Sequence, residues 1–191
     1  MSTGRSLAHL VDQVLDGRYR IVRLLAEGGM SAVYEAEQLQ VERRVAIKVL
    51  RPEISENPEM LARFRSEARI ISELRHPNTL KLFDYGNTED GMLYLVTELL
   101  AGEPLSLRLK RGPLSPKETL HVLVEVLRSL QEAHGHGVIH RDLKPGNLFL
   151  EEVAGETVVK VLDFGIAKMK AKRSEDPEQP TTADGMLLGT P

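Results

Sequence analysis

The chain has 191 residues, 41% of them hydrophobic and 28% charged, with 25 lysines and arginines against 28 aspartates and glutamates. This balance is typical of a folded globular protein and excludes a fully disordered chain, and the missing basic excess argues against a nucleic-acid binder. The absence of cysteine excludes disulfides and cysteine-ligated zinc. No apolar stretch approaches the roughly 20 residues of a transmembrane helix, so we expect no membrane segment here and a cytoplasmic location.

The first half of the chain has the residue pattern of β-strands, after a lead-in over residues 1–16. A turn at Glu27–Gly29 predicts a hairpin, and Pro58 suits the first turn of a helix that ends near His76. Five strands are expected, at residues 19–25, 32–36, 45–50, 80–85 and 92–98. We therefore predict a five-stranded antiparallel sheet with one helix over residues 17–100.

The second half, residues 101–191, is predicted to be mainly helical. Ser115 and Glu118 form a capping box with proline between them, and the helix that they begin ends near Gly135 or Gly137. Leucines recur on it at positions 120, 123, 127 and 130. Short strands are expected at 147–150 and 157–162, and a mobile charged loop at 168–185. The fold class is therefore α+β.

The strongest functional signal is the string from His140 to Asn147, followed by Asp163–Phe164–Gly165. Phosphoryl transfer from ATP needs a carboxylate that orients the attacking hydroxyl, oxygen ligands for Mg²⁺, and positive charge near the phosphates. A pair of Asx-rich turns is the alternative, which any of these residues alone would favour. The chain supplies the three parts as follows: Asp142 the carboxylate, Asn147 and Asp163 the metal ligands, Lys144 the charge.

Taken together, these residues resemble the eukaryotic-type Ser/Thr protein kinases, in their bacterial branch, from about Tyr19 to Pro191. The string at 140–147 resembles the family's catalytic loop, Asp163–Gly165 its metal-binding motif, and Val45–Lys48 the strand with the ATP lysine. The resemblance implies a two-lobed kinase fold, ATP and Mg²⁺ as cofactors, and protein substrates phosphorylated on serine or threonine.

Lys48 lies inside an apolar strand, where an unpaired ammonium costs free energy. Glu67 falls on the apolar face of the predicted helix, between Phe64 and Ile71, and also needs a partner. We predict a Lys48–Glu67 ion pair, which matches the pair that holds the family's lysine on the ATP phosphates. Pairing of Glu67 with Arg63, one turn back, is the alternative.

The family's glycine-rich phosphate loop is only partly present. Its three glycine positions correspond to Ala26, Gly28 and Ser31 in this sequence, so only the central position is occupied by glycine. Backbone contacts to phosphate are still expected, with weaker ATP binding. The resemblance also assigns an adenine site, with these members: Val33, Ala46 and Phe149 around the base, Thr97 as gatekeeper, and the backbone of Glu98 to Leu100 as the hinge.

Regulation and metal binding give further expectations. Arg141 before the catalytic aspartate resembles kinases that are switched by phosphorylation of the activation loop. Candidate acceptors are Thr181 and Thr182, then Ser174, whereas Thr190 would contact the catalytic residues. A zinc site is not expected at the three histidines His134, His136 and His140, since no further ligand follows at the usual spacing, and His140 resembles a packing residue.

The sequence ends before the helices that follow the activation loop in the family. We therefore expect a fragment of a longer kinase, in which a missing C-terminal region or a partner chain covers the leucine stripe. Isolated, the chain is expected to be marginally stable. The alternatives to an active kinase are a pseudokinase or ATP-binding scaffold, and a small-molecule phosphotransferase of related fold.

Overall fold

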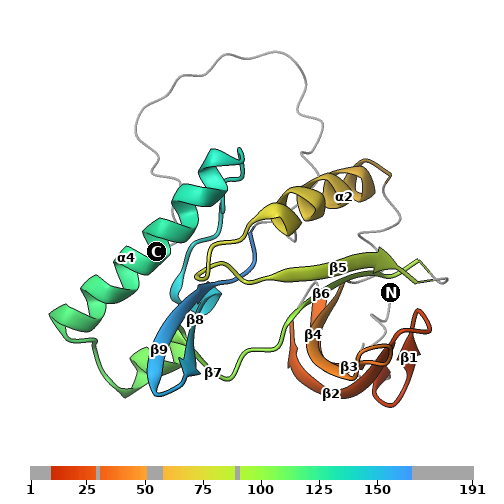
Figure 1. The fold of residues 1–191 in the computed structure, drawn as a ribbon, viewed down its shortest axis with the longest axis horizontal. Coiled ribbons are helices and arrows are strands. Elements are labelled where there is room, and N and C mark those ends of the chain that lie inside the picture. Colours follow the sequence, from red (N-terminus) through yellow and green to blue (C-terminus); the bar gives the residue numbers. More distant parts are fainter. Residues whose placement is uncertain (1–9, 29–30, 51–57, 89–90, 165–191) are drawn as a thin grey trace, which may run out of the picture.

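The computed structural model describes residues 10–28, 31–50, 58–88 and 91–164. An antiparallel six-stranded sheet with helix α2 (Pro58–Glu73) forms one part, and a three-stranded sheet with helix α4 (Pro116–Gly135) forms the other (Figure 1). The first sheet has the order β1-β2-β3-β4-β6-β5. Its strands are β1 (Val14–Leu15), β2 (Tyr19–Glu27), β3 (Ser31–Gln38), β4 (Arg43–Leu50), β5 (Leu82–Asn87) and β6 (Leu93–Glu98).

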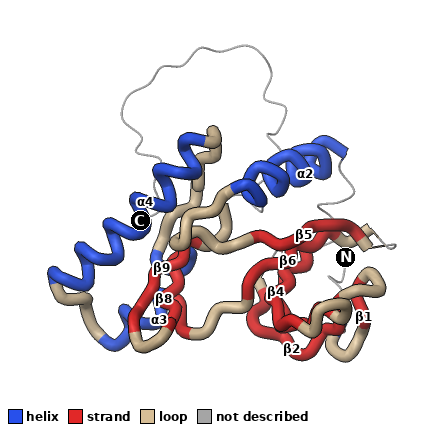
Figure 2. The backbone as a smooth tube through the Cα atoms, in the orientation of Figure 1, coloured by secondary structure: helices blue, strands red, loops and turns tan. Residues whose placement is uncertain are grey.

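The second sheet follows a short linker after β6, as the backbone trace shows (Figure 2). It has the order β7-β8-β9, all antiparallel. Its elements and those around it are β7 (Gly102–Pro104), α3 (Leu105–Arg108), 3₁₀ turns at Leu109–Arg111 and Pro145–Asn147, β8 (Leu148–Val153) and β9 (Glu156–Val161). No helix in the described ranges is long and apolar enough to cross a membrane.

The mixed helix-and-sheet fold class is confirmed, and the five predicted strands of the first sheet are present. The sheet also contains a sixth strand, β1, inside the segment expected to be a lead-in. Leu10 and Leu15 are buried in the same apolar cluster as Tyr34 and Ile47. A two-residue strand is too short for an alternation to predict it.

Strand β4 shows how the sheet positions a functional side chain. Val45, Ile47 and Val49 are fully buried on one face, whereas Ala46 and Lys48 alternate with them and are partly exposed. Because successive side chains of a strand point to opposite faces, burial of the three aliphatic residues places Lys48 on the other face.

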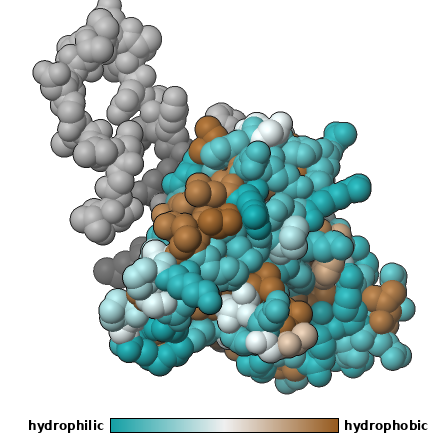
Figure 3. Space-filling view, turned by 60° about the vertical axis from the view of Figure 1, so that its left-hand side comes forward, coloured by the Kyte–Doolittle hydropathy of each residue, from teal (hydrophilic) through white to brown (hydrophobic). Residues whose placement is uncertain are grey.

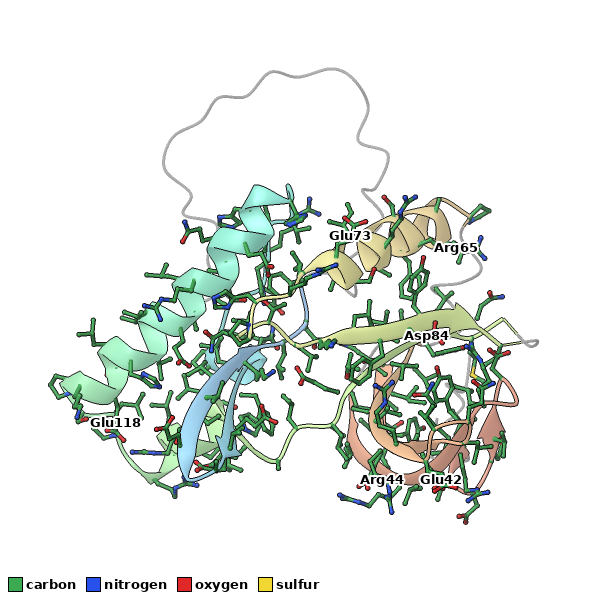
Figure 4. The ribbon with its side chains drawn as sticks, in the orientation of Figure 1. Glu42, Arg44, Arg65, Glu73, Asp84 and Glu118 are labelled. Atoms are coloured by element: carbon green, nitrogen blue, oxygen red, sulfur yellow. The ribbon has the colours of Figure 1, made fainter. Side chains whose placement is uncertain are left out.

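A polar network that the sequence did not reveal joins the N-terminal strands to β5, where Asp84 lies (Figure 4). Arg18 and the Tyr19 hydroxyl both donate to Asp84 Oδ2, each at 2.7 Å. Tyr94 donates to Asp16 at 2.6 Å, and this bond, with that from Arg18, lowers the pKa of the Asp16 carboxyl. The network fixes the start of β2 against the sheet.

The buried tyrosines predict a loss of stability at alkaline pH. Burial raises the pKa of Tyr19 and of Tyr34 to about 12. The folded state therefore favours the neutral phenols, and this stabilisation is present below the unfolded pKa of about 10 and is lost as the pH rises towards 12. Denaturant melts at pH 8, 10 and 11 should show it. Tyr34→Phe, which cannot ionise, should have the shallower decline; equal slopes would contradict the prediction.

The segment between α2 and β5 connects the two sheets. Val161 N, in β9, donates to Asn78 O at 2.7 Å, and Leu80 N donates to Val161 O at 3.0 Å. From the other side, the Glu132 carboxylate of α4 accepts the backbone N–H groups of Arg75 and His76. The segment after α2 is thereby fixed to β9, which precedes Asp163, and to α4, which precedes the 140–147 loop.

Helix α4 begins with the predicted capping box. Ser115 Oγ accepts from Glu118 N at 3.2 Å, the Glu118 carboxylate accepts from Ser115 N at 2.7 Å, and Figure 4 shows Glu118 at the start of the helix. The buried face consists of Val122, Val126, Ser129 and Ala133. Of the leucine stripe, Leu120, Leu123 and Leu127 are 64%, 52% and 62% exposed, whereas Leu130 is partly buried against the core. Figure 3, in which the α4 side comes forward, shows apolar side chains gathered there.

Replacing the three exposed leucines by glutamine should make the isolated chain more soluble without destabilising it. Their side chains lose little buried area, and glutamine has a helix propensity close to that of leucine. At each protein concentration the triple variant should therefore scatter less light than the wild type, while its melting temperature stays within about 2 °C of the wild-type value. Val122→Gln, on the buried face, is the matched control and should lower the free energy of unfolding by about 2–4 kcal/mol. A large loss of stability in the triple variant would contradict the exposure of the stripe.

Candidate active site

Lys48 and Asp163 lie together, although 115 positions separate them in the chain. Lys48 Nζ is 2.7 Å from Asp163 Oδ1, with the lysine side chain 14% and the aspartate 45% exposed. Asp163 follows β9 and has a φ of 50°, in the left-handed region that aspartate tolerates better than most residues. The contact joins the first sheet to the loop after the second.

The predicted partner of Lys48, Glu67, lies in α2, but its side chain is outside the described part of the structure. The same is true of Arg63, the alternative partner. Phe64, Ala68 and Ile71 on this helix are buried in one apolar cluster with Leu82 and Phe164. The Lys48–Glu67 ion pair therefore stays a prediction, and the partner that the structure gives Lys48 is Asp163.

The residues of the predicted catalytic loop form one hydrogen-bonded group. Asn147 Nδ2 donates to the backbone oxygen of Asp142 at 2.8 Å and to its carboxylate at 3.2 Å. Lys144 Nζ is 3.0 Å from Asp142 Oδ2. The amide nitrogen of Asn147 thus makes two contacts with Asp142, and its amide oxygen is the acceptor left for another partner. The carboxylate of Asp142 is 14% exposed and is held in place by two neighbours.

His140 connects this loop to the strand before Asp163. Its Nε2 is 2.7 Å from Leu162 O, and its Nδ1 accepts the backbone N–H of Asp142 at 3.3 Å, contacts that fit the tautomer with the proton on Nε2. Its ring lies 5.0 Å from that of Phe164. Leu162 N also donates to Asn147 O at 2.8 Å. The two loops that carry Asn147 and Asp163 are therefore joined directly.

The donor set fits a hard cation that completes its coordination with phosphate oxygens. Mg²⁺ is usually bound by one or two protein oxygen ligands together with substrate phosphates and water. Asn147 has its amide oxygen uncommitted to Asp142, and Asp163 has a second carboxylate oxygen besides the one at Lys48. Among the described residues, no three His, Cys, Asp or Glu side chains form a metal-binding group.

Most of the residues expected around adenine share one face of the first sheet. Val33 pairs directly with Lys48, and Ala46 with Thr97, so these side chains lie on the face that carries the lysine. All are partly buried. Phe149 belongs to β8 in the second sheet. The hinge segment, Glu98 to Leu100, runs from β6 towards β7 and is partly buried.

The phosphate-loop residues lie at the β2–β3 turn. Ala26 pairs with Val33 and is exposed, and Gly28 N donates to Ser31 O at 2.8 Å. Residues 29–30 lie outside the described ranges. So do residues 165–191, which include the candidate phosphorylation sites Ser174, Thr181 and Thr182, and Thr190; those expectations remain predictions.

A separate hollow of about 910 Å³ lies between β7–β9, α3 and the first half of α4. Val122, Leu114 and Leu150 contribute apolar lining. Its arginines are already paired, Arg111 with Glu103 and Arg108 with Glu118. None of the candidate catalytic residues lines it, so it is distinct from the site built around Lys48 and Asp142.

One largely buried lysine was overlooked in the sequence. Lys160, in β9, is 2.8 Å from Glu98 at the start of the hinge. The reasoning that gave Lys48 a partner applies equally to Lys160, which is flanked by valines on an apolar strand. The signal was therefore present, but nothing in the sequence named the partner.

The sequence matches the protein kinase domain family over residues 19–185. The chain belongs to the protein kinase family. It is 45% identical over 185 residues to the serine/threonine-protein kinase PknA of Mycobacterium tuberculosis, an alignment that covers 94% of this chain and 41% of PknA. The serine/threonine-protein kinase PrkC of Bacillus subtilis is 39% identical over 159 residues, which cover 83% of this chain and 24% of PrkC.

The fold also matches solved kinase structures. The crystal structure of the M. tuberculosis PknI kinase domain superposes with a TM-score of 0.72 at 30% identity, covering 82% of this chain and 62% of that one. A double mutant of the same domain gives a TM-score of 0.75. The chain spans less than half the length of the curated relatives PknA and PrkC.

Proposed function

We propose that this kinase chain carries the ATP-binding and catalytic residues of a protein serine/threonine kinase. The observation that carries the proposal is the Lys48–Asp163 contact of 2.7 Å beside the Asp142–Asn147–Lys144 group. Lys48 from the first sheet, Asp163 after β9, and the 142–147 loop together supply two cations, two carboxylates and one amide, the groups that phosphoryl transfer requires. The serine/threonine-kinase names of the relatives support this specificity.

The proposed roles follow from the contacts. Asp142, oriented by Asn147, would accept the proton of the attacking hydroxyl, and Lys144 would stabilise charge on the transferred group. Lys48 would contact the ATP phosphates, while Asn147 and Asp163 would hold Mg²⁺. When bound, Mg²⁺ would neutralise charge on the phosphates. Adenine would lie against Val33, Ala46 and Phe149, with Thr97 behind it and the Glu98–Leu100 backbone at its edge; Ala26 and Gly28 would lie over the phosphates.

The roles of the two lobes are also part of this proposal. Residues 17–100 would form the nucleotide-binding lobe and residues 101–191 part of the substrate lobe, with residues 1–16 preceding them. Protein substrates would bind to the second part, and the parent protein's substrates would be proteins with serine or threonine acceptors.

Transfer of label from γ-labelled ATP with Mg²⁺ tests the proposal. A generic basic protein and a small alcohol such as glycerol are offered as acceptors in parallel, and binding of Mg-ADP is measured directly. Label on serine or threonine of the protein is expected. Nucleotide binding without any transfer would instead support an ATP-binding scaffold, consistent with the replaced glycines at positions 26 and 31. Label on the alcohol alone would support a small-molecule phosphotransferase.

A further inference from the structure

Lys160 is a nearly buried cation that the proposed chemistry does not use. It lies on β9, three positions before Asp163, between the fully buried Val159 and Val161. Its side chain is 12% exposed. An ammonium group at this depth needs partners, because its desolvation is otherwise uncompensated.

The partners are carboxylates from two different elements. Lys160 Nζ is 2.8 Å from Glu98 Oε1, at the end of β6, and 3.9 Å from Glu151 Oε2, on β8. The Glu98 side chain is 23% exposed. A pair this well shielded is screened by salt less than a surface ion pair.

The same Glu98 oxygen also fixes a third segment. Glu98 Oε1 accepts the backbone N–H of Lys81 at 2.9 Å, and Glu98 N donates to Lys81 O at 3.1 Å. One carboxylate oxygen therefore joins the start of the hinge, the segment that enters β5, and β9.

Both sides of the proposed base site depend on this junction. Glu98 begins the hinge segment, whose backbone would bind the edge of the base. Phe149, which would lie against its face, is the direct cross-strand partner of Lys160. Lys160 thus lies opposite Phe149 in the strand pair and forms an ion pair with Glu98.

We propose that Lys160 is a positioning residue for the adenine of ATP, which holds the hinge at Glu98 in register with the strand pair that carries Phe149. The inference rests on the proposed function. Lys160 acts through Glu98 and makes no contact with the nucleotide itself. Its loss should therefore weaken recognition of the base and leave recognition of the phosphates unchanged.

Lys160→Met keeps the aliphatic stem and removes the charge. Direct binding measurements should show the Kd of Mg-ADP and the Kd of adenosine each rising up to about tenfold, because loss of this charge-assisted hydrogen bond lowers the population of the hinge conformation that binds the base. Inorganic triphosphate lacks the adenine base, so its inhibition constant in the presence of Mg²⁺ should not change. Lys160→Arg, which keeps the cation, should bind adenosine within about threefold of the wild type.

Glu98→Gln tests the other side of the pair, because its amide oxygen can still accept from Lys81 N. It should weaken adenosine binding about as much as Lys160→Met, and the double variant should be no weaker than either single one, as expected for residues that act as a unit. Should Lys160→Met fail to fold, Glu98→Gln and Lys160→Arg carry the test. Arg20→Met breaks the exposed Arg20–Glu37 pair of 3.0 Å and is the matched control, with no expected change.

The outcomes separate this inference from the proposed function. A wild-type chain that does not bind Mg-ADP would overturn the proposed function, and this inference with it. A wild type that binds while Lys160→Met binds adenosine equally well would overturn the positioning role alone. A lower melting temperature with an unchanged Kd would do the same, since it would show a purely structural ion pair. Weaker triphosphate binding would also contradict it.

Discussion

Asp142→Asn is expected to lower kcat for phosphoryl transfer by about 10³-fold, because a positioned general base contributes roughly 10²–10⁴. The substitution keeps the shape of the side chain and an oxygen that can accept from Asn147, so the loop should keep its conformation. What is lost is the charge that, in the proposed mechanism, accepts a proton from the attacking hydroxyl. The Kd of Mg-ADP should stay within about twofold, since no proposed nucleotide contact involves Asp142.

Initial rates of protein phosphorylation, together with direct binding of Mg-ADP, measure this split between turnover and binding. Asp12→Asn is the matched control: Asp12 is exposed and has a φ of 67°, which asparagine also tolerates, so neither quantity should change. Transfer at the wild-type rate in Asp142→Asn would contradict the role of this carboxylate as the base.

The parts of the site that the sequence predicted are those in which residue types and local spacing coincide. The string from His140 to Asn147 forms one loop, and its internal contacts join residues five positions apart at most. Lys48 was correctly placed within an apolar strand, and the alternating aliphatic residues of that strand are the ones that the structure buries. Predictions of this kind need only local geometry.

What the sequence did not predict depends on distant partners. The closeness of Lys48 and Asp163 was expected, but only through the resemblance to kinases, in which both residues contact Mg-ATP. The ion pair between Lys160 and Glu98, which also joins segments far apart in the chain, was not expected at all. A pattern shows that a buried lysine needs a carboxylate but not which of the 28 acidic residues supplies it. The short strand at Val14–Leu15 was missed for another reason, since its pairing with β2, and not its own residues, makes it a strand.

The leucine stripe on α4 was predicted to lack its covering helix in this chain, and Leu120, Leu123 and Leu127 are exposed. The sequence did not reveal the second apolar face of this helix, which packs against β9 and its surroundings through Val122, Val126 and Ala133. Leu120 and Leu127 have the same spacing and remain exposed. Hydropathy alone cannot rank two apolar stripes of one helix, because the choice depends on what packs against each of them.

Lys48→Met should remove most phosphoryl transfer and also weaken nucleotide binding, which distinguishes it from Asp142→Asn. A preorganised cation that stabilises developing charge typically contributes about 10²–10³ in kcat, and loss of one charge-assisted contact to a bound phosphate raises the Kd of Mg-ADP about tenfold. The folded state should be little affected. The only described partner of Lys48, Asp163, is 45% exposed, so water can solvate its carboxylate when the lysine is gone.

The decisive comparison is between activity and the melting temperature. For Lys48→Met we expect a loss of transfer of about 10²-fold or more with a melting temperature within about 2 °C of the wild type. Lys110→Met, at an exposed lysine of the turn after α3, is the control and should change neither. Lys48→Arg tests geometry: the charge stays, but a planar guanidinium cannot reproduce a compact ammonium 2.7 Å from Asp163, so activity should remain well below wild type. A fully active arginine variant would mean that charge alone, without placement, accounts for the role of Lys48.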